Sequence, residues 1–193
     1  MNKALILLTA LSPVLLGCIP AGEADAGAPP KIRSIYDGTP APRGEALFRK
    51  VMLDSQNRAR REVGLAALQW DDALARDAAT YARAMARSGR FAHDPQSGVA
   101  VRQGENLWMG TRDAFSYAEM SGGWIDEDRY FKRGAFPESS TTGRWSDVGH
   151  YTQIIWATTT HMRCAIASNR KDDYLVCRYN PAGNVVGRNP LTG

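Results

Sequence analysis

Two histidines lie in stretches whose residue types could support chemistry. One of them, His150, belongs to the run Asp147-Val-Gly-His-Tyr-Thr-Gln-Ile-Ile-Trp156. Ser146 or Asp147 is a good helix N-cap there, and the apolar residues that follow favour burial. A histidine in the first turn of a helix lies near the positive end of the helix dipole, which disfavours a charged ring. The resulting neutral imidazole can accept a proton or bind a metal ion.

The second histidine, His93, stands at the start of a loop predicted for residues 91–104. On its own it would more often be a hydrogen-bonded structural residue than a ligand. Glu105 follows the loop directly and opens a predicted strand, Asn106-Leu-Trp-Met109. A carboxylate that faces inward from a strand needs a cation or donors, because burying it unpaired costs several kcal/mol. We therefore expect Glu105 and His93 to bind each other.

Three helices and a hairpin are predicted around these residues. The helices cover about residues 45–63, 71–88 and 114–131, with Gly64 and Gly89 ending the first two and Asp71 capping the second. In the first helix, Asn57 is expected to be a buried amide that hydrogen-bonds neighbouring loops. A long Gly/Ser/Thr-rich loop is expected from Lys132 to Asp147, and such loops often rim sites.

The hairpin spacing predicts a disulfide. If Arg170-Lys171 is a two-residue turn, Ile166 lies opposite Leu175 and Cys164 lies opposite Cys177. In an exported domain this pair should oxidise, and the bond should contribute on the order of 3 kcal/mol. Two free buried thiols are the alternative.

The first 18 residues read as an export signal, with Lys3, an apolar run and then Leu15-Leu-Gly-Cys18. Gly17 before Cys18 resembles a bacterial lipobox, which implies lipid attachment to Cys18. Cleavage after Ala24-Asp25-Ala26, which would discard Cys18, is the alternative. Either way, we expect the protein to leave the cytoplasm, and only the N-terminal lipid would attach it to a membrane.

Residues 19–43 are rich in Pro, Gly and Ala and are expected to form a tether. A single domain should follow over 44–187, with a C-terminal tail at 188–193. The formal net charge of +4 is modest. Basic residues are not interleaved with aromatics, so nucleic acid is not an expected partner. We expect a monomer.

Five stretches resemble, in order, the motifs of the CAP superfamily, the cysteine-rich secretory, antigen 5 and pathogenesis-related proteins, also called SCP domains. They are Phe91-Ala-His-Asp94, Gly104-Glu-Asn-Leu-Trp108, Trp124-Ile-Asp-Glu-Asp-Arg-Tyr130, the His150 run, and Tyr174-Leu-Val-Cys-Arg-Tyr-Asn-Pro-Ala-Gly-Asn184. The resemblance covers about residues 45–187 and includes Gln56-Asn57-x-x-Arg60 in the first helix. It implies an α+β fold, an α-β-α sandwich with a small antiparallel sheet between helical layers.

The resemblance also implies that four residues line one cleft, which we call the His/Glu tetrad: His93, Glu105, Glu127 and His150. Asp126 and Asp128 flank Glu127, and periodicity does not choose among the three carboxylates. The family spacing Trp124-x-x-Glu127 selects Glu127.

A convergent tetrad suits a divalent cation. Two neutral imidazole nitrogens and one or two carboxylate oxygens suit zinc, with positions left open for water, and the resemblance adds magnesium. We expect His93 and His150 to be the metal ligands, with Glu105 and Glu127 orienting the rings or completing the coordination. A metal-free, hydrogen-bonded quartet is the alternative, and His161 is expected to be a surface residue and not a third ligand.

The leading functional hypothesis is a non-catalytic exported binding module. Its ligand could be a small molecule, a lipid, a peptide or a component of the cell envelope. The sequence contains no Gly-x-Ser-x-Gly, His-Glu-x-x-His, Gly-x-Gly-x-x-Gly or phosphate-binding loop. One alternative is a metal-dependent hydrolase with Glu105 or Glu127 as general base. Another is a structural or interaction lipoprotein with a vestigial cleft.

Overall fold

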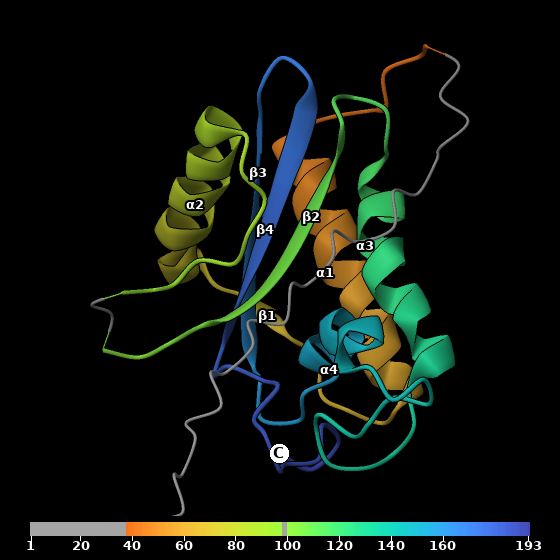
Figure 1. Cartoon of the computed structure of the whole chain (residues 1–193). Coiled ribbons are helices and arrows are strands. Elements are labelled where there is room, and N and C mark those ends of the chain that lie inside the picture. Colours follow the sequence, from red (N-terminus) through yellow and green to blue (C-terminus); the bar gives the residue numbers. More distant parts are fainter. Residues whose placement is uncertain (1–37, 98–99) are drawn as a thin grey trace, which may run out of the picture.

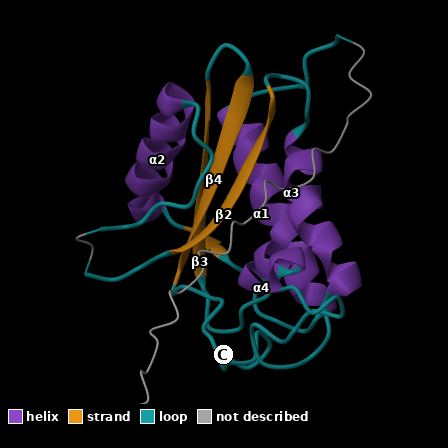
Figure 2. Cartoon of the chain, in the orientation of Figure 1, coloured by secondary structure: helices purple, strands orange, loops and turns teal. Residues whose placement is uncertain are grey.

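A four-stranded sheet lies between two layers of helices in the computed structural model, which describes residues 38–97 and 100–193 (Figures 1 and 2). Helix α2 covers one face, and α1, α3 and α4 cover the other (Figure 1). The α-helices are α1 (Glu45–Glu62), α2 (Ala75–Ser88), α3 (Tyr117–Ile125) and α4 (Gly149–Ile154). This arrangement confirms the predicted α+β sandwich.

The sheet has the strand order β1-β3-β4-β2. Its strands are β1 (Gln69–Trp70), β2 (Gly104–Thr111), β3 (His161–Ser168) and β4 (Asp172–Asn180). The three long strands are antiparallel, as expected, but the two-residue β1 pairs in parallel with β3. The sheet is therefore mixed, since β1 adds a short parallel pair at one edge.

The predicted hairpin register is confirmed. Ile166 lies opposite Leu175 and Cys164 lies opposite Cys177, with Arg170 and Lys171 in the turn. The two cysteines form a disulfide, and both are buried. The bond therefore crosses the two central strands directly.

Each face of the sheet has its own apolar core. Between the sheet and α1, α3 and α4, the larger cluster includes Met52, Met120, Ile154 and Leu175. The smaller cluster joins α2 to the sheet through alanines such as Ala78 and Ala82, packed against Tyr174 and Val176. Short alanine side chains let α2 approach the strands closely, so α2 serves as scaffold.

Helix ends follow local signals in most places. Gly64 and Gly89 have positive φ after α1 and α2, and Asp71 caps a short 3-10 helix, η1 (Asp72–Leu74), that leads into α2. Asn57 is buried and binds both backbone groups of Leu68, as predicted.

The third helix is shorter than the predicted span 114–131. Ser116 and Glu119 form a capping box that starts α3 at Tyr117, because each side chain binds the other's backbone amide. The chain then tightens into a 3-10 helix, η2 (Asp126–Tyr130). The third predicted segment is therefore two helical pieces joined at Asp126.

The predicted N-cap of α4 was wrong. Neither Ser146 nor Asp147 caps this helix, which is preceded by the 3-10 helix η3 (Trp145–Asp147) and by Val148. The Asp147 carboxylate instead accepts hydrogen bonds from Thr142 and Arg144, and the Thr142 bond holds its pKa below the usual value. Asp147 therefore stabilises the loop before α4 by binding Thr142 and Arg144, and another residue must cap α4.

Both ends of the described chain pack onto the domain. Ala41 donates its amide to the Asp113 carbonyl, and Arg43 binds the buried Asp173 carboxylate. In the tail, the Arg188 carbonyl accepts from the Phe136 amide and the Pro190 carbonyl accepts from the Ala157 amide. Every helix and strand of the described residues, and both apolar clusters, lie between Glu45 and the tail, so the segment from Gly38 onward contains its own core.

The predicted signal, Cys18 and most of the tether lie outside the described residues. In residues 38–97 and 100–193, no helix has the length and apolar composition needed to span a bilayer.

Candidate functional site

The first His–Glu pair lies where the loop before β2 meets that strand. The His93 Nδ1 and Glu105 Oε1 atoms are 2.6 Å apart, and the Asp94 amide donates to the same oxygen at 3.1 Å. The Glu105 side chain is only 5% exposed, whereas the His93 side chain is 63% exposed. The strand thus buries the carboxylate and leaves the imidazole accessible to solvent.

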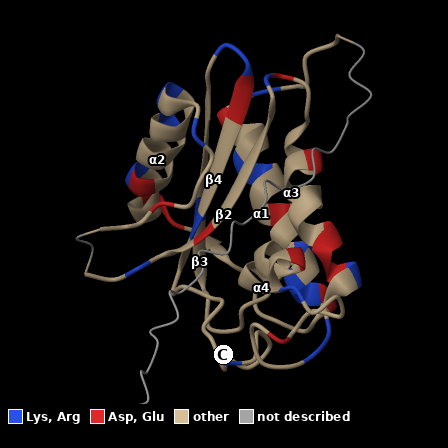
Figure 3. Cartoon of the chain, in the orientation of Figure 1, with Lys and Arg blue, Asp and Glu red and all other residues tan. Residues whose placement is uncertain are grey.

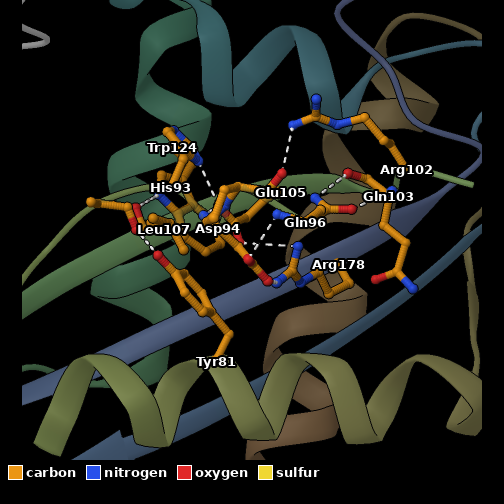
Figure 4. A network of polar contacts seen from close by, with 12 residues as sticks. Tyr81, His93, Asp94, Gln96, Arg102, Gln103, Glu105, Leu107, Trp124 and Arg178 are labelled. Carbon is orange, nitrogen blue, oxygen red and sulfur yellow. Dashed lines mark hydrogen bonds and ion pairs between the residues drawn. The ribbon is translucent and has the colours of Figure 1, made fainter. Parts of the chain in front are cut away.

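Arg178 on β4 supplies the cation that the buried carboxylate requires. Its guanidinium lies 3.1 Å from Glu105 Oε2 and 2.5 Å from Asp94 Oδ2. Tyr81 reaches up from α2, stacks beneath this guanidinium and donates its hydroxyl to the Ala92 carbonyl (Figure 4). Burial raises the pKa of Tyr81 to about 12, and the charges of Glu105 and Asp94 act in the same direction. The neutral phenol therefore braces the loop that carries His93.

The second pair joins η2 to α4. The His150 Nδ1 and Glu127 Oε1 atoms are 2.6 Å apart, while Glu127 Oε2 accepts the backbone amides of His150 and Tyr151. The first amides of a helix lack partners within it, so a carboxylate placed there acts as a cap. Glu127 therefore replaces the predicted local cap of α4 and also orients its histidine.

Trp124 and Asn106 connect the two pairs through β2. The Trp124 indole stacks on the His150 ring, with centroids 5.9 Å apart, and donates to the Leu107 carbonyl. Asn106, the residue after Glu105, donates to the His150 carbonyl and to the Tyr179 hydroxyl. Neighbouring residues of one strand therefore fix both pairs.

The structure organises the four predicted residues as two hydrogen-bonded pairs. In the part of the chain that the structure describes, no group of three or more His, Cys, Asp or Glu side chains is arranged to hold a metal ion. In both rings the carboxylate binds Nδ1, so Nε2 is the nitrogen left for a ligand. By their chemistry, two imidazoles with carboxylates on Nδ1 are the kind of donor that can bind a metal through Nε2, with the carboxylates orienting the rings.

His161 lies away from both pairs. It opens β3, and its Nδ1 lies 2.8 Å from the Thr160 hydroxyl. Two cavities, of about 240 and 410 Å³, are lined by other residues and include no member of the tetrad.

Sequence reasoning missed three residues that support the site: Arg178, Asp94 and Tyr81. Arg178 had a detectable signal, because it is a charged residue inside the otherwise apolar run of β4 from Tyr174 to Tyr179, and a buried charge needs a partner. Asp94 and Tyr81 had none, since an acid beside a loop histidine and a tyrosine on an alanine-rich helix are ordinary features.

Comparison with known proteins identifies the family. The profile of the cysteine-rich secretory protein family, CAP, matches residues 53–179. Pathogenesis-related protein 1C of Nicotiana tabacum is 34% identical over 139 residues, which cover 72% of this chain and 77% of that protein. Cysteine-rich venom protein VAR3 of Varanus acanthurus is 39% identical over 128 residues, covering 63% and 67% respectively.

Solved structures share the fold at lower identity. BmVAL-1 has a TM-score of 0.61 and 21% identity, covering 79% of this chain and 86% of that chain. NaASP2, in a structure titled as containing Zn²⁺, has a TM-score of 0.60 and 22% identity, covering 78% and 88%.

Two relatives have names that point to secretion. They are the venom protein and Secreted protein RBT4 of Candida albicans, which is 32% identical over 152 residues. These relatives support the prediction that this chain is exported. The family profile covers most of the chain and the relatives match over most of the domain, and we conclude that the chain belongs to the cysteine-rich secretory protein (CAP) family.

Proposed function

We propose that this chain is an exported CAP-family binding protein that holds a divalent metal ion through the Nε2 atoms of His93 and His150. One observation carries the proposal: each imidazole has its Nδ1 bound to a carboxylate at 2.6 Å. A carboxylate on one ring nitrogen sets the tautomer and makes the other nitrogen a better ligand.

The two glutamates would position the rings, and the metal would supply the ligand-binding centre. When bound, a zinc or magnesium ion offers open coordination positions to water or to an anionic group of a ligand. Glu105 is held by Arg178 and the Asp94 amide, and Glu127 by two backbone amides. Because only two protein ligands hold the ion, we expect weaker and more reversible binding than at a four-ligand structural zinc site.

The structure of NaASP2 with Zn²⁺ supports a metal as a candidate ligand for this fold. At 22% identity, the likeness of NaASP2 to this chain shows a shared fold but does not show that the two proteins share a metal site. The proposal for this chain therefore depends on its own two pairs.

The carboxylate contacts favour binding over hydrolysis. A general base needs an oxygen free to accept a proton from water. Both Glu127 oxygens are engaged by His150 or by backbone amides, and Glu127 is 16% exposed. The remaining oxygen of Glu105 faces Arg178 and is buried. Activity on a peptide panel, lost with Glu105→Gln or Glu127→Gln and with chelator, would instead support the hydrolase.

Zinc titration by calorimetry on residues 38–193 tests the proposal. We expect one-to-one binding that is lost in the His93→Ala/His150→Ala double variant and kept in His161→Ala, the matched control. A repeat with magnesium separates the two candidate ions. If wild type and double variant bind alike, or neither binds, the metal proposal is wrong and a structural role for the tetrad is favoured.

The proposal extends to where the exported protein is held. We infer that lipid attached to Cys18 holds the exported domain at a membrane. The full chain should partition into detergent and Cys18→Ser should not, whereas equal partition of both would exclude lipidation at this residue.

A further inference from the structure

A basic groove lies at the end of the sheet that carries the β3–β4 turn, which we call the hairpin end. This cavity of about 410 Å³ is lined by Arg83 and Arg87 from α2, by Arg170 from the turn, and by small or polar residues such as Ala86, Ala167 and Asn169. The Asn169 amide donates to the Ala86 carbonyl, which joins the turn to the helix. The three arginines therefore converge from two elements that are held together.

These arginines have no acidic partner in the part of the chain that the structure describes. All three are exposed, as is the neighbouring Lys171. Asp173 at this end is buried and bound to Arg43, and Asp113 lies beside Arg43 and Arg112. Asp172 is the other acid nearby, and Figure 3 shows blue segments on α2 and on the turn around the red end of β4. The hairpin end thus presents an excess of positive charge.

The described chain also enters the domain at the hairpin end. Ala41 binds the Asp113 carbonyl just after β2, and Arg43 binds Asp173 and the Phe115 carbonyl. Any anchor attached before residue 38 therefore pulls on this end. Glu105 of the tetrad lies near the start of β2, and the hairpin end lies beyond Thr111 at the other end of the strand. At about 3.3 Å per residue, the two are about 20 Å apart.

We propose that the basic groove docks the domain on an anionic membrane surface, with its arginines on the phosphate groups of the lipids. A guanidinium matches phosphate oxygens with two parallel donors, and a cluster of them adds attraction to an anionic bilayer. In this pose Gly38, where the described chain begins, lies on the membrane side of the domain and the tetrad faces away from the membrane. Single-stranded nucleic acid is a poorer fit, because the groove has no aromatic side chain on which a base could stack.

Vesicle sedimentation with residues 38–193 tests this docking without any lipid anchor. We expect binding to vesicles of phosphatidylcholine and phosphatidylglycerol in equal parts, but not to phosphatidylcholine alone. Arg83→Gln/Arg87→Gln/Arg170→Gln should weaken it by about fivefold per charge, or on the order of 100-fold in total. Binding should also fall as added salt shortens the Debye length from about 10 Å to about 3 Å.

The matched control is Arg58→Gln/Arg61→Gln/Arg133→Gln, which removes the same charge from exposed positions outside the groove. It should bind as wild type does, and both triple variants should unfold at the wild-type temperature.

Orientation is checked with a polarity-sensitive dye, because residues 38–193 contain only the disulfide-bonded cysteines. A dye on Lys171→Cys should respond to anionic vesicles, and a dye on Glu138→Cys should not. Equal weakening of both triple variants, absence of binding, or a response at position 138 alone would overturn the proposal. Full competition by free glycerol phosphate at the same phosphate concentration would reassign the groove to a small phosphate ligand.

Discussion

At the scale of single residues, the two histidines are held very differently. His150 is stacked on Trp124 and bound to Glu127, and its side chain is 23% exposed. His93 stands in a loop and is 63% exposed. Its position therefore depends on Glu105, which in turn depends on Arg178. One ligand of the proposed site is fixed by helix packing and the other by a buried ion pair.

Glu127→Gln should destabilise the domain as well as loosen His150. The amide keeps one acceptor oxygen but loses the charge that faces the start of α4 and its histidine, so we expect a loss of about 1–3 kcal/mol in the free energy of unfolding. Urea unfolding measures the change. Asp128→Asn, one residue away and exposed, is the matched control. Equal stability of Glu127→Gln and wild type would mean that α4 does not depend on this cap.

At the scale of secondary structure, short-range signals predicted most elements correctly. Gly64 and Gly89 end their helices because the residue after a helix often needs positive φ. The two-residue turn set the register that brings Cys164 opposite Cys177. Contacts between distant segments were not predictable in this way. The cap of α4 comes from Glu127, which lies 23 residues before His150. Glu127 reaches the amides of α4 only because η2 packs against that helix.

The sequence predicted the contact of His93 with Glu105, which the structure contains, but it did not predict the contact of His150 with Glu127 or the part played by Arg178. Residue types and family spacing named His93, Glu105, Glu127 and His150. Their division into two pairs depends on which atoms the backbone amides and Arg178 engage. A burial pattern cannot contain that information, because it records neither side-chain direction nor the partner of a charge.

The cross-strand disulfide should stabilise the hairpin and the domain. Replacing both cysteines, Cys164→Ser/Cys177→Ser, should lower the free energy of unfolding by about 3 kcal/mol, because the bond closes a short loop in the unfolded chain. Urea unfolding of oxidised wild type, reduced wild type and the double variant measures this. Reduced wild type should resemble the variant. If reduction leaves stability unchanged, the hairpin contacts alone hold these strands.

At the scale of the whole molecule, the site and the basic groove occupy opposite ends of one sheet. The sheet links them rigidly, since β2 and β4 pair along their full length. If the proposed anchor and the proposed ligand site are present, the domain would present its site away from the surface that holds it.

Buried tyrosines should make the domain sensitive to alkali. Burial raises the pKa of Tyr81 and of Tyr151 to about 12, so the folded state keeps both protons above pH 10, where the unfolded chain loses them. Their contribution to stability is complete below about pH 10 and is lost as the pH rises toward about 12. Urea unfolding across this range should show a steeper decline for wild type than for Tyr81→Phe/Tyr151→Phe.

The comparison with the variant is essential for that experiment. Burial also lowers the pKa of Arg60 to about 10, which acts in the opposite direction over the same range. Tyr130→Phe, at an exposed position, is the matched control. If the double variant declines as steeply as wild type, the two phenols do not drive the alkaline loss.

The double role of Glu127 affects how selection would act on this site. A descendant that lost its ligand would still keep Glu127, because two backbone amides of α4 depend on it. His93 has no such protection, since it is largely exposed and lies in a loop. Among diverging copies of this protein, drift at His93 would mark the loss of binding earlier than any change at Glu127.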